Sequence, residues 1–426
     1  MLRKIKQLLH KIGPGFITGA SDDDPSGIAT YSQTGAIFGY HQLWTAVFSF
    51  PFMTIIQEMC GRIGIVTGKG LAGVIKHHYS KKVLYFSVLI LLLANTINIG
   101  ADLGAMAASA QLLFNIPFFI LLIGITALCL LLQIFVPYRT YANILKYFTF
   151  SLFAYIITAF VVKQDWVLIL KSTFLPEFTF GSTYLLNIVA ILGTTISPYL
   201  FFWQASEEVE EEVKSGKLKS MGAGIPKFTK RDIKDLRIDT TIGMLFSNLV
   251  MFFIIVTTAS TLGQHGITEI QSADQAAQAL RPLAGNFAYL LFAAGIIGTG
   301  LLAVPVLAGS AAYAFSEAFG WKEGLYRKFS QAHTFYAVII VATLVGLLTN
   351  FTHIPPFKML YYTAVLNGIC APPLLVLIML ISNNKKIMHN YTNGTISNLL
   401  GWLITGIMSI SALAILGIFI TNLIQK

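Results

Sequence analysis

Long runs of apolar residues recur along the chain, separated by short polar segments. An α-helix needs about 20 apolar residues to cross the hydrocarbon core of a bilayer, and most of these runs approach that length. The pattern therefore predicts an all-α polytopic membrane protein, with about eleven transmembrane helices in one domain. The predicted spans lie at about 12–40, 43–66, 83–114, 117–136, 147–162, 184–204, 241–262, 287–315, 335–348, 356–381 and 399–423.

Polar residues and a proline interrupt two of the predicted spans. The first is broken at Ser21-Asp22-Asp23-Asp24-Pro25-Ser26-Gly27, and the sixth at Gly193-Thr194-Thr195-Ile196-Ser197-Pro198-Tyr199. Since proline lacks an N–H, each break leaves backbone carbonyls without intrahelical partners. Such carbonyls and a nearby carboxylate are ligands for a metal ion, although proline can also simply kink a membrane helix.

Breaks in the first and sixth spans are what two inverted five-helix repeats would produce. In transporters of that kind, the broken helices meet near the middle of the bilayer and coordinate the cargo while one bundle rocks against the other. We predict a LeuT-like arrangement with one repeat at about 12–163, a second at about 183–381 and an extra span at about 399–423.

Composition supports an integral membrane protein and explains its positive charge. Hydrophobic residues make up 55% of the chain and charged residues only 11%, against about 25% charged in ordinary soluble domains. If the N-terminus is cytoplasmic, 24 of the 29 basic residues fall in inside segments, which is the expected bias. We therefore expect a multi-pass plasma-membrane protein in contact with lipid, and neither nucleic acid nor an obligate protein partner. The inside basic residues lie within 1–11, 62–82, 139–146, 214–237, 322–328 and 385–386.

Acidic residues within the spans are candidates for function. A charge at membrane depth costs at least about 2.5 kcal/mol, so Asp22, Asp23 and Asp24 need a cation, a polar partner or water. Asp102 in the third span is either functional or a helix–helix hydrogen-bonding group. The run 207–212, with five glutamates, is either a solvated helix end or a funnel that attracts cations.

Several motifs resemble the Nramp family of divalent metal transporters. Asp24-Pro25-Ser26-Gly27 is similar to the Asp-Pro-Gly-Asn signature of that family's first helix, and Ser197-Pro198-Tyr199 to the Met-Pro-His of its sixth. Asp102 falls where the third helix has an acidic residue, and Gln57 with Arg62-Ile63-Gly64 resembles the end of the second helix.

The resemblance implies a metal site in which Asp24 supplies a carboxylate, Ser21 and Thr194 supply backbone carbonyls, and Ser197 stands in place of the family's methionine. Gly27 replaces the signature's asparagine, and Tyr199 and Gln204 stand in place of two histidines. Further candidates for the surroundings of the site or the pathway are Asp22, Asp23, Asp102, Asn367 and Cys370.

These departures change the expected cargo. A methionine sulfur favours transition metals, whereas a site of oxygen ligands suits Mg²⁺, Ca²⁺ or Mn²⁺. Losing the asparagine at Gly27 should leave room for an ion that keeps some water, as Mg²⁺ usually does. We expect transport of Mg²⁺, with Mn²⁺ as a second substrate, as in the Nramp-related magnesium transporter branch. No cofactor is expected beyond the transported ion.

Proton coupling is predicted to be weak, because the sixth span has no histidine and 335–348 has no basic residue. The alternatives are a proton-coupled Mn²⁺ or Fe²⁺ transporter and, in another class, a cation channel. An organic-solute carrier is disfavoured, since acids at the break would repel a substrate carboxylate. The sequence contains no signature of a membrane enzyme, such as a nucleophile elbow or a phosphate-binding glycine loop.

Overall fold

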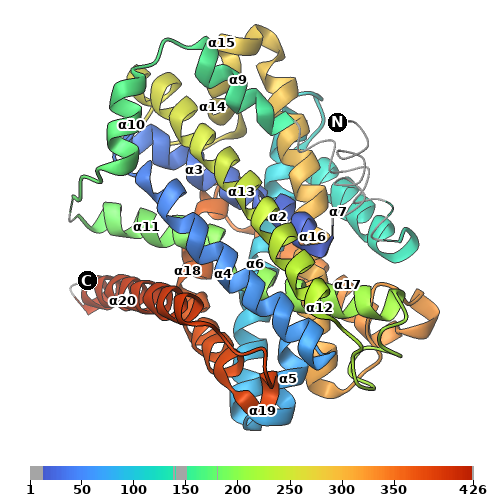
Figure 1. Ribbon diagram of the computed structural model, residues 1–426. Coiled ribbons are helices and arrows are strands. Elements are labelled where there is room, and N and C mark those ends of the chain that lie inside the picture. Colours follow the sequence, from blue (N-terminus) through green and yellow to red (C-terminus); the bar gives the residue numbers. More distant parts are fainter. Residues whose placement is uncertain (1–12, 138–139, 141–150, 180, 425–426) are drawn as a thin grey trace, which may run out of the picture.

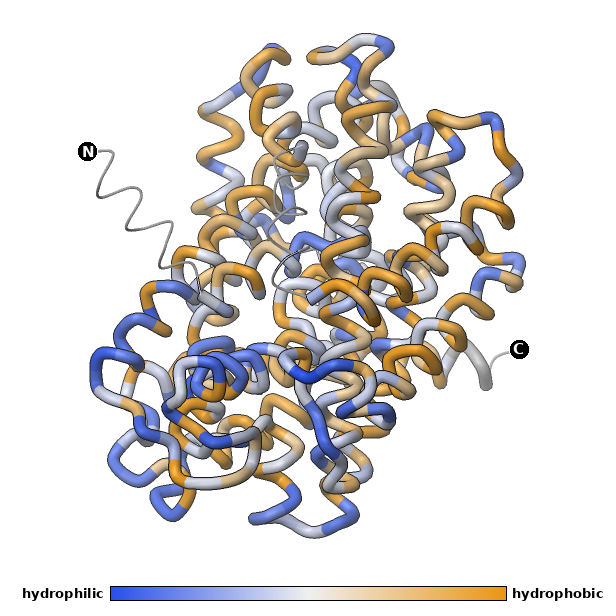
Figure 2. Tube along the Cα trace, turned by 90° about the vertical axis from the view of Figure 1, so that its right-hand side faces the viewer, coloured by the Kyte–Doolittle hydropathy of each residue, from blue (hydrophilic) through white to orange (hydrophobic). Residues whose placement is uncertain are grey.

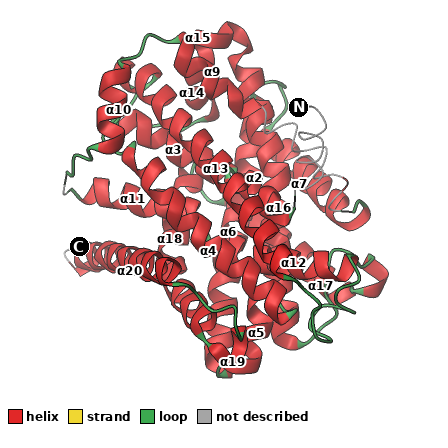
Figure 3. Ribbon diagram, viewed as in Figure 1, coloured by secondary structure: helices red, strands yellow, loops and turns green. Residues whose placement is uncertain are grey.

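Helices form nearly all of the chain in the computed structural model, which describes residues 13–137, 140, 151–179 and 181–424 (Figures 1 and 3). The described residues contain no strand, and an isolated bridge joins Ser220 to Ala223. The predicted basic N-terminal segment 1–11, the basic residues Arg139 and Lys146, and the predicted start of the fifth span at Tyr147 lie outside the described residues.

Helices in the first half of the chain match the predicted order of spans. The first span is split into two helices, and a short helix follows the second span. The helices are α2 (Pro14–Asp22), α3 (Pro25–Phe38), α4 (Trp44–Thr67), α5 (Leu71–His78), α6 (Lys81–Gln111), α7 (Phe118–Phe135), α9 (Phe153–Val161) and α10 (Trp166–Phe174).

The second half likewise begins with a split helix, which is followed by long continuous ones. These are α11 (Ser182–Thr195), α12 (Pro198–Lys214), α13 (Lys230–Thr261), α16 (Ala288–Phe319), α17 (His333–Leu348), α18 (Pro356–Asn383) and α20 (Thr395–Ile424). Short helices α14 (Ala273–Ala277), α15 (Arg281–Ala284) and α19 (Lys385–Met388) lie in the connections.

Eight helical segments of the described chain are long and apolar enough to cross a membrane. One of them is the α11–α12 pair taken together, and the others contain α6, α7, α13, α16, α17, α18 and α20. The other three of the eleven predicted spans correspond to the broken pair α2–α3, to α4 and to α9. The polytopic all-α class is thus confirmed.

The long polar connection after the sixth span is shorter than the sequence predicted. The seventh span was predicted to begin at 241, after a connection whose basic residues lie within 214–237, but α13 already begins at Lys230. A capping box explains the difference: the Thr229 side chain accepts from the Asp232 N–H, and the Asp232 carboxylate accepts from the Thr229 N–H at 2.8 Å. These reciprocal bonds satisfy the first free donors of the helix, so it begins eleven residues before the predicted apolar span.

The acidic run 207–212 is not a solvated helix end. Glu207, Glu208, Glu210 and Glu212 are all buried, on the last turns of α12. Neighbouring segments cover them, because Tyr313 of α16 and the backbone N–H of Leu325 both donate to Glu210. The solvated interpretation was therefore wrong.

Buried charged side chains near the end of the second span pair with each other. Arg62 and Glu58 on α4 form an ion pair at 3.1 Å, and Arg237 on α13 donates to Glu58 at 2.8 Å. Arg62 also donates to the carbonyl of Tyr391. This network ties α4 to α13 and to the segment before α20.

The broken helices lie at the centre of the bundle. α2 packs against α12 and α13, while α3 packs against α11, α13 and α18, and α13 runs beside both in Figure 1. Glycines permit the contact with α13: a Cβ built on Gly19 would lie 2.3 Å from the Gly243 backbone, and one on Gly15 would lie 2.7 Å from the N of Thr240. A side chain at Gly15 or Gly19 would therefore collide with α13.

Polarity is distributed unevenly along the bundle. Figure 2 shows hydrophilic segments gathered in the lower part of the view, with the upper and middle parts mainly hydrophobic. Apolar side chains of α7 and α20 are exposed on the outside, as expected for surfaces that face lipid. Examples are Ile120, Ile123, Phe135, Ile410 and Leu413.

Candidate metal centre

The two helix breaks face each other inside the bundle. α2 ends at Asp22 and α3 begins at Pro25; α11 ends at Thr195 and α12 begins at Pro198. In both cases proline takes the first helical position, where its missing N–H costs nothing. Since α2 contacts α12 and α3 contacts α11, two helix C-termini and two N-termini converge on one region.

Asp24 is the carboxylate at this convergence. It caps α3 in an extended conformation, and its Oδ1 accepts from the N–H of Gly27 and from the hydroxyl of Ser26, both at 2.7 Å. Its Oδ2 accepts from the side-chain amide of Asn98 on α6 at 3.2 Å. All these donors are neutral, so they orient the carboxylate without cancelling its charge.

Backbone carbonyls at the ends of α2 and α11 are further oxygen atoms at the two breaks. The hydroxyl of Tyr199 on α12 donates to the carbonyl of Ser21 at 3.0 Å, which links the two breaks directly. The Ser197 hydroxyl lies 2.8 Å from the carbonyl oxygen of Gly193 and 2.7 Å from that of Thr194, and its single proton is shared between them. A carbonyl has two lone pairs, so Ser21 and Thr194 each retain acceptor capacity.

Gly27 lies against Thr194, where the two broken helices touch. A Cβ at Gly27 would lie 3.2 Å from the Thr194 hydroxyl and 3.3 Å from the ring of Tyr31. The extra room that we expected from the missing asparagine is therefore filled by these neighbours. Glycine here allows the helices to approach each other.

Asp102 lies on α6 one turn after Asn98, and both side chains are fully buried. Neither carboxylate oxygen of Asp102 has a hydrogen-bond partner, and Oδ1 of Asn98 also lacks one. The alternative of a helix–helix hydrogen bond for Asp102 finds no support here. The candidate site residues did not include Asn98, although its spacing of four from Asp102 places both on one helix face.

Asp22 and Asp23 are buried beside Asp24 and share one partner. The hydroxyl of Ser247 on α13 lies 2.6 Å from Oδ2 of Asp22 and 3.1 Å from Oδ1 of Asp23. A hydroxyl has a single proton to donate, and the other oxygen of each acid has no partner. Nothing in the local sequence of Ser247 distinguished it from other polar residues of a membrane helix.

Gln204 and Asn367, the remaining candidates, lie at different places. Gln204 connects α12 to α2, because Thr18 donates to its Oε1 and its amide donates to Glu208 at 2.9 Å. Asn367 is buried on α18, and its amide nitrogen has no partner. Cys370 on the same helix is only partly buried.

The centre is rich in carboxyl groups and poor in positive charge. Asp22, Asp23, Asp24 and Asp102 are each at most 1% exposed. The ion pairs within the described part of the chain all involve other acids. An uncompensated charge is costly to bury, so these acids require a cation or protons.

Ligand types at the centre suit a hard cation. No cluster of three or more His, Cys, Asp and Glu side chains arranged for a metal occurs in the described ranges. A metal at this point would thus be held by Asp24 together with neutral oxygens of carbonyls, amides and water, which Mg²⁺ and Mn²⁺ accept.

Cavities lie on either side of the centre. One of about 230 Å³ is bordered by Gln33 on α3, Thr183 on α11 and Lys358 on α18. The other, about 200 Å³, lies between α12, α13 and the start of α2. Because Asp24, Ser21 and Ser197 are each 1% exposed, this conformation closes the centre to solvent.

The family model "Natural resistance-associated macrophage protein-like" matches residues 15–417, which is nearly the whole chain. The chain belongs to the Nramp family. The resemblance seen in the two helix breaks therefore extends across all the Nramp spans.

Curated relatives of this Nramp protein are divergent but similar in length. A divalent metal cation transporter MntH of Caldanaerobacter subterraneus is 24% identical over 413 residues, covering 96% of this chain and 92% of the relative. An MntH of Klebsiella pneumoniae is 26% identical over 417 residues, covering 95% and 93%.

Solved structures share the Nramp protein's fold. The crystal structure of the Eremococcus coleocola manganese transporter has a TM-score of 0.76 at 18% identity, with 96% of this chain and 86% of that chain covered. Mhp1, a nucleobase-cation-symport-1 family transporter, has a TM-score of 0.56 at 12% identity, with 95% and 90% covered. The predicted LeuT-like fold is thus confirmed, while the repeat boundaries stay a prediction.

Proposed function

We propose that this protein carries divalent metal ions across the membrane by alternating access, with Mg²⁺ as the principal cargo and Mn²⁺ as a second one. The observation that supports transport most directly is the buried group of Asp22, Asp23, Asp24 and Asp102, which lacks a basic partner among the described residues. A divalent cation bound at Asp24 would supply the missing charge.

The proposed ligands are the carboxylate of Asp24, the carbonyls of Ser21 and Thr194 and the hydroxyl of Ser197, with water completing the shell. The C-terminal ends of α2 and α11 favour a cation because their last carbonyls carry partial negative charge. Oxygen ligands without a thioether favour Mg²⁺ over softer metals. The MntH relatives, which are named divalent metal cation transporters, support the general class.

Alternating access is favoured over a channel because the centre is sealed from solvent in the structure. A carrier must bind its cargo and then open to one side at a time. We further propose uptake, with the N-terminus in the cytoplasm, from the distribution of basic residues.

Metal uptake by purified protein in liposomes tests the proposal. We expect saturable Mg²⁺ uptake that Mn²⁺ inhibits and that Asp24→Asn abolishes, since the amide removes the negative charge and keeps the shape. Asp274→Asn, at an exposed acid on α14, is the matched control and should transport normally. Full Mg²⁺ uptake by Asp24→Asn would refute the assignment, and flux that rises linearly with concentration would indicate a channel.

The main alternative is proton-coupled Mn²⁺ or Fe²⁺ transport, and the unpartnered oxygens of Asp102 favour it, because a buried acid of this kind can hold a proton. A pH-sensitive dye inside the liposomes separates the two. We expect no acidification during Mg²⁺ uptake. Acidification that tracks the influx and is lost in Asp102→Asn would establish coupling.

A further inference from the structure

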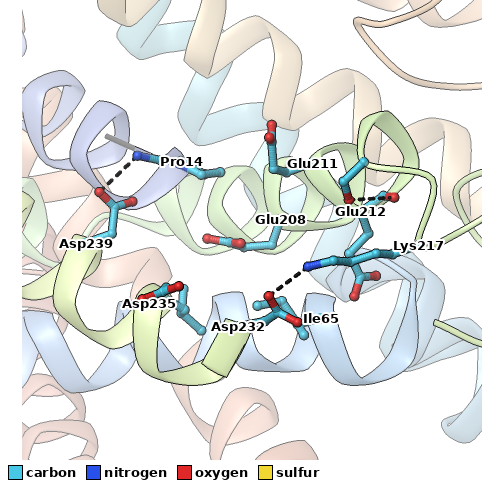
Figure 4. A pocket seen from close by; sticks show the side chains of 12 residues that line it. Pro14, Ile65, Glu208, Glu211, Glu212, Lys217, Asp232, Asp235 and Asp239 are labelled. Atoms are coloured by element: carbon cyan, nitrogen blue, oxygen red, sulfur yellow. Dashed lines mark hydrogen bonds and ion pairs between the residues drawn. The ribbon is translucent and has the colours of Figure 1, made fainter. Parts of the chain in front are cut away.

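A second group of acids surrounds the cavity between α12, α13 and the start of α2 (Figure 4). The cavity has a volume of about 200 Å³ and lies on the side of the bundle that carries the basic connection 214–229. Six carboxyl groups and one lysine line it, namely Glu208, Glu211, Glu212, Asp232, Asp235, Asp239 and Lys217.

Several of these groups already have partners. Lys217 pairs with Asp232 at 2.7 Å, and Arg231 lies 3.7 Å from Asp235. Asp239 accepts from the N–H groups of Gly13, Gly15 and Phe16, at 2.7 to 3.2 Å, and so caps α2. These three aspartates are accounted for by the fold.

No hydrogen bond or ion pair of this kind among the described residues accounts for the buried carboxylate of Glu212. Glu212 is only 5% exposed, it lines the cavity, and neither of its carboxylate oxygens has a hydrogen-bond partner. Glu208 lies one turn earlier on the same face of α12 and accepts from Gln204. Like charges spaced four residues apart on a helix repel each other, and Lys217, which also lines the cavity, is paired with Asp232, so a cation between the two carboxylates would relieve this repulsion.

Both the surroundings and the space fit a hydrated divalent ion. Glu212 lies in the last turn of α12, where the helix dipole favours positive charge. The cavity is much larger than a bare ion needs, and Mg²⁺ commonly binds through one or two carboxylates while keeping several waters. Waters between the ion and the protein also explain why no tight cluster of metal ligands occurs in the described chain.

We propose that Glu208 and Glu212 form a second divalent-cation site, which binds a hydrated Mg²⁺ or Mn²⁺ ion in this cavity, separate from the centre at Asp24. The bonds from Glu208 through Gln204 to Thr18 connect the site to α2, one turn before its acidic break. The site is therefore placed where an ion would pause on its way to or from the centre.

Equilibrium binding of Mn²⁺ to the purified full-length protein in detergent tests this site, with free Mn²⁺ measured by electron paramagnetic resonance. We expect two bound ions per chain in the wild type. Glu212→Gln should lose one, with affinity at that site falling at least about tenfold. Mg²⁺ should compete for both ions. The matched control is Glu207→Gln, which makes the same charge change on α12 but borders a different cavity, and it should retain two ions.

A second variant tests the site by strengthening it. Lys217→Gln removes the ammonium that lines the cavity and should tighten the weaker Mn²⁺ site several-fold. A wild type that binds one ion, or a Glu212→Gln protein that binds two with unchanged affinities, would overturn the proposal. If Glu212→Gln does not fold, Lys217→Gln decides the matter, and unchanged Mn²⁺ binding in that variant would overturn the proposal.

This proposal can fail independently of the transport function. Asp24→Asn should lose the ion at the centre and keep the one at Glu212. Two ions in the wild type without any Mg²⁺ uptake in liposomes would refute transport but leave the second site standing. Conversely, a wild type that takes up Mg²⁺ while binding a single ion, which Asp24→Asn loses, would refute the second site and leave transport standing.

Discussion

The Asp24 carboxylate is held by neutral hydrogen-bond donors, so the loss of one donor should weaken metal binding at Asp24. The amide of Asn98 fixes Oδ2, while Ser26 and the Gly27 N–H fix Oδ1. The carboxylate is thus oriented before any ion arrives, and binding need not pay for ordering it.

Asn98→Ala should weaken metal binding without preventing transport. A hydrogen bond to a charged group contributes about 1.5–3 kcal/mol, so the KM for Mg²⁺ should rise about tenfold or more. Uptake by liposomes at a series of Mg²⁺ concentrations would measure the change. An unchanged KM would show that this bond does not prepare the site.

Asn95→Ala is the matched control for that experiment. Asn95 lies three residues earlier on α6 and donates to the Leu307 carbonyl at 2.9 Å and to the Ser310 hydroxyl at 2.7 Å, so it joins α6 to α16. Its loss should lower stability and leave the KM for Mg²⁺ near that of the wild type.

The residues of the site could be predicted only in part. Local sequence marks both helix breaks, because a proline beside polar residues is unusual in an apolar run, and Asp24 and Ser197 do lie there. The bond from Tyr199 to Ser21 and the shared Ser247 join positions far apart in the chain. No spacing rule relates such positions, so only the folded structure shows them.

At the scale of elements, α2 is a short helix whose N-terminus is capped by another helix. Asp239 of α13 accepts from the backbone N–H groups of Gly13, Gly15 and Phe16. A carboxylate at this position satisfies free donors and complements the positive end of the helix dipole. The start of α2 is thereby bound to α13.

Asp239→Ala should destabilise the protein by about 1–3 kcal/mol, because three partly buried donors lose their acceptor. We expect a clear fall in the apparent unfolding temperature in detergent. Asp165→Ala is the comparison: Asp165 caps the exposed helix α10 through one bond to Leu168, so its loss should cost less. Equal effects of the two changes would contradict the anchoring role of Asp239.

The sequence predicted which segments form helices, but it predicted the ends of those helices less well. The apolar runs located α6, α13 and α18 correctly, since their interiors face lipid or other helices. The start of α13 was misplaced because seven of its first ten residues are charged and the capping box, rather than hydrophobicity, sets the boundary. Burial of the glutamates on α12 depends on the cover from α16 and on the segment around Leu325.

Across the whole molecule, buried acids also occur away from the centre. Burial raises the pKa of the Glu323 carboxyl, in the connection after α16, well above its ordinary range. Glu317 and Glu210 raise that pKa further, while Arg327 and Lys76 oppose the shift. Folding therefore favours the protonated form of Glu323, and its contribution to stability is lost as pH rises through the raised pKa.

Glu323→Gln should stabilise the protein at high pH, since the amide resembles the protonated acid. The apparent unfolding temperature should exceed that of the wild type at pH 9, and the difference should shrink toward pH 5. Glu269→Gln, at an exposed acid 3.7 Å from Lys358, should show no such trend. A difference for Glu323→Gln that stays constant with pH would contradict the assigned protonation.

The backbone seam between α2 and α13 has a mechanical consequence. Around Gly19 and Gly243 the two backbones lie so close that no side chain fits between them, while Asp239 and Ser247 of α13 bond to the two ends of α2. An interdigitated interface would have to unpack before one helix could shift along the other. The close glycine contact presents no such obstacle, so a shift of α2 along α13 would instead have to break the hydrogen bonds that Asp239 makes at the start of α2 and Ser247 makes at its end.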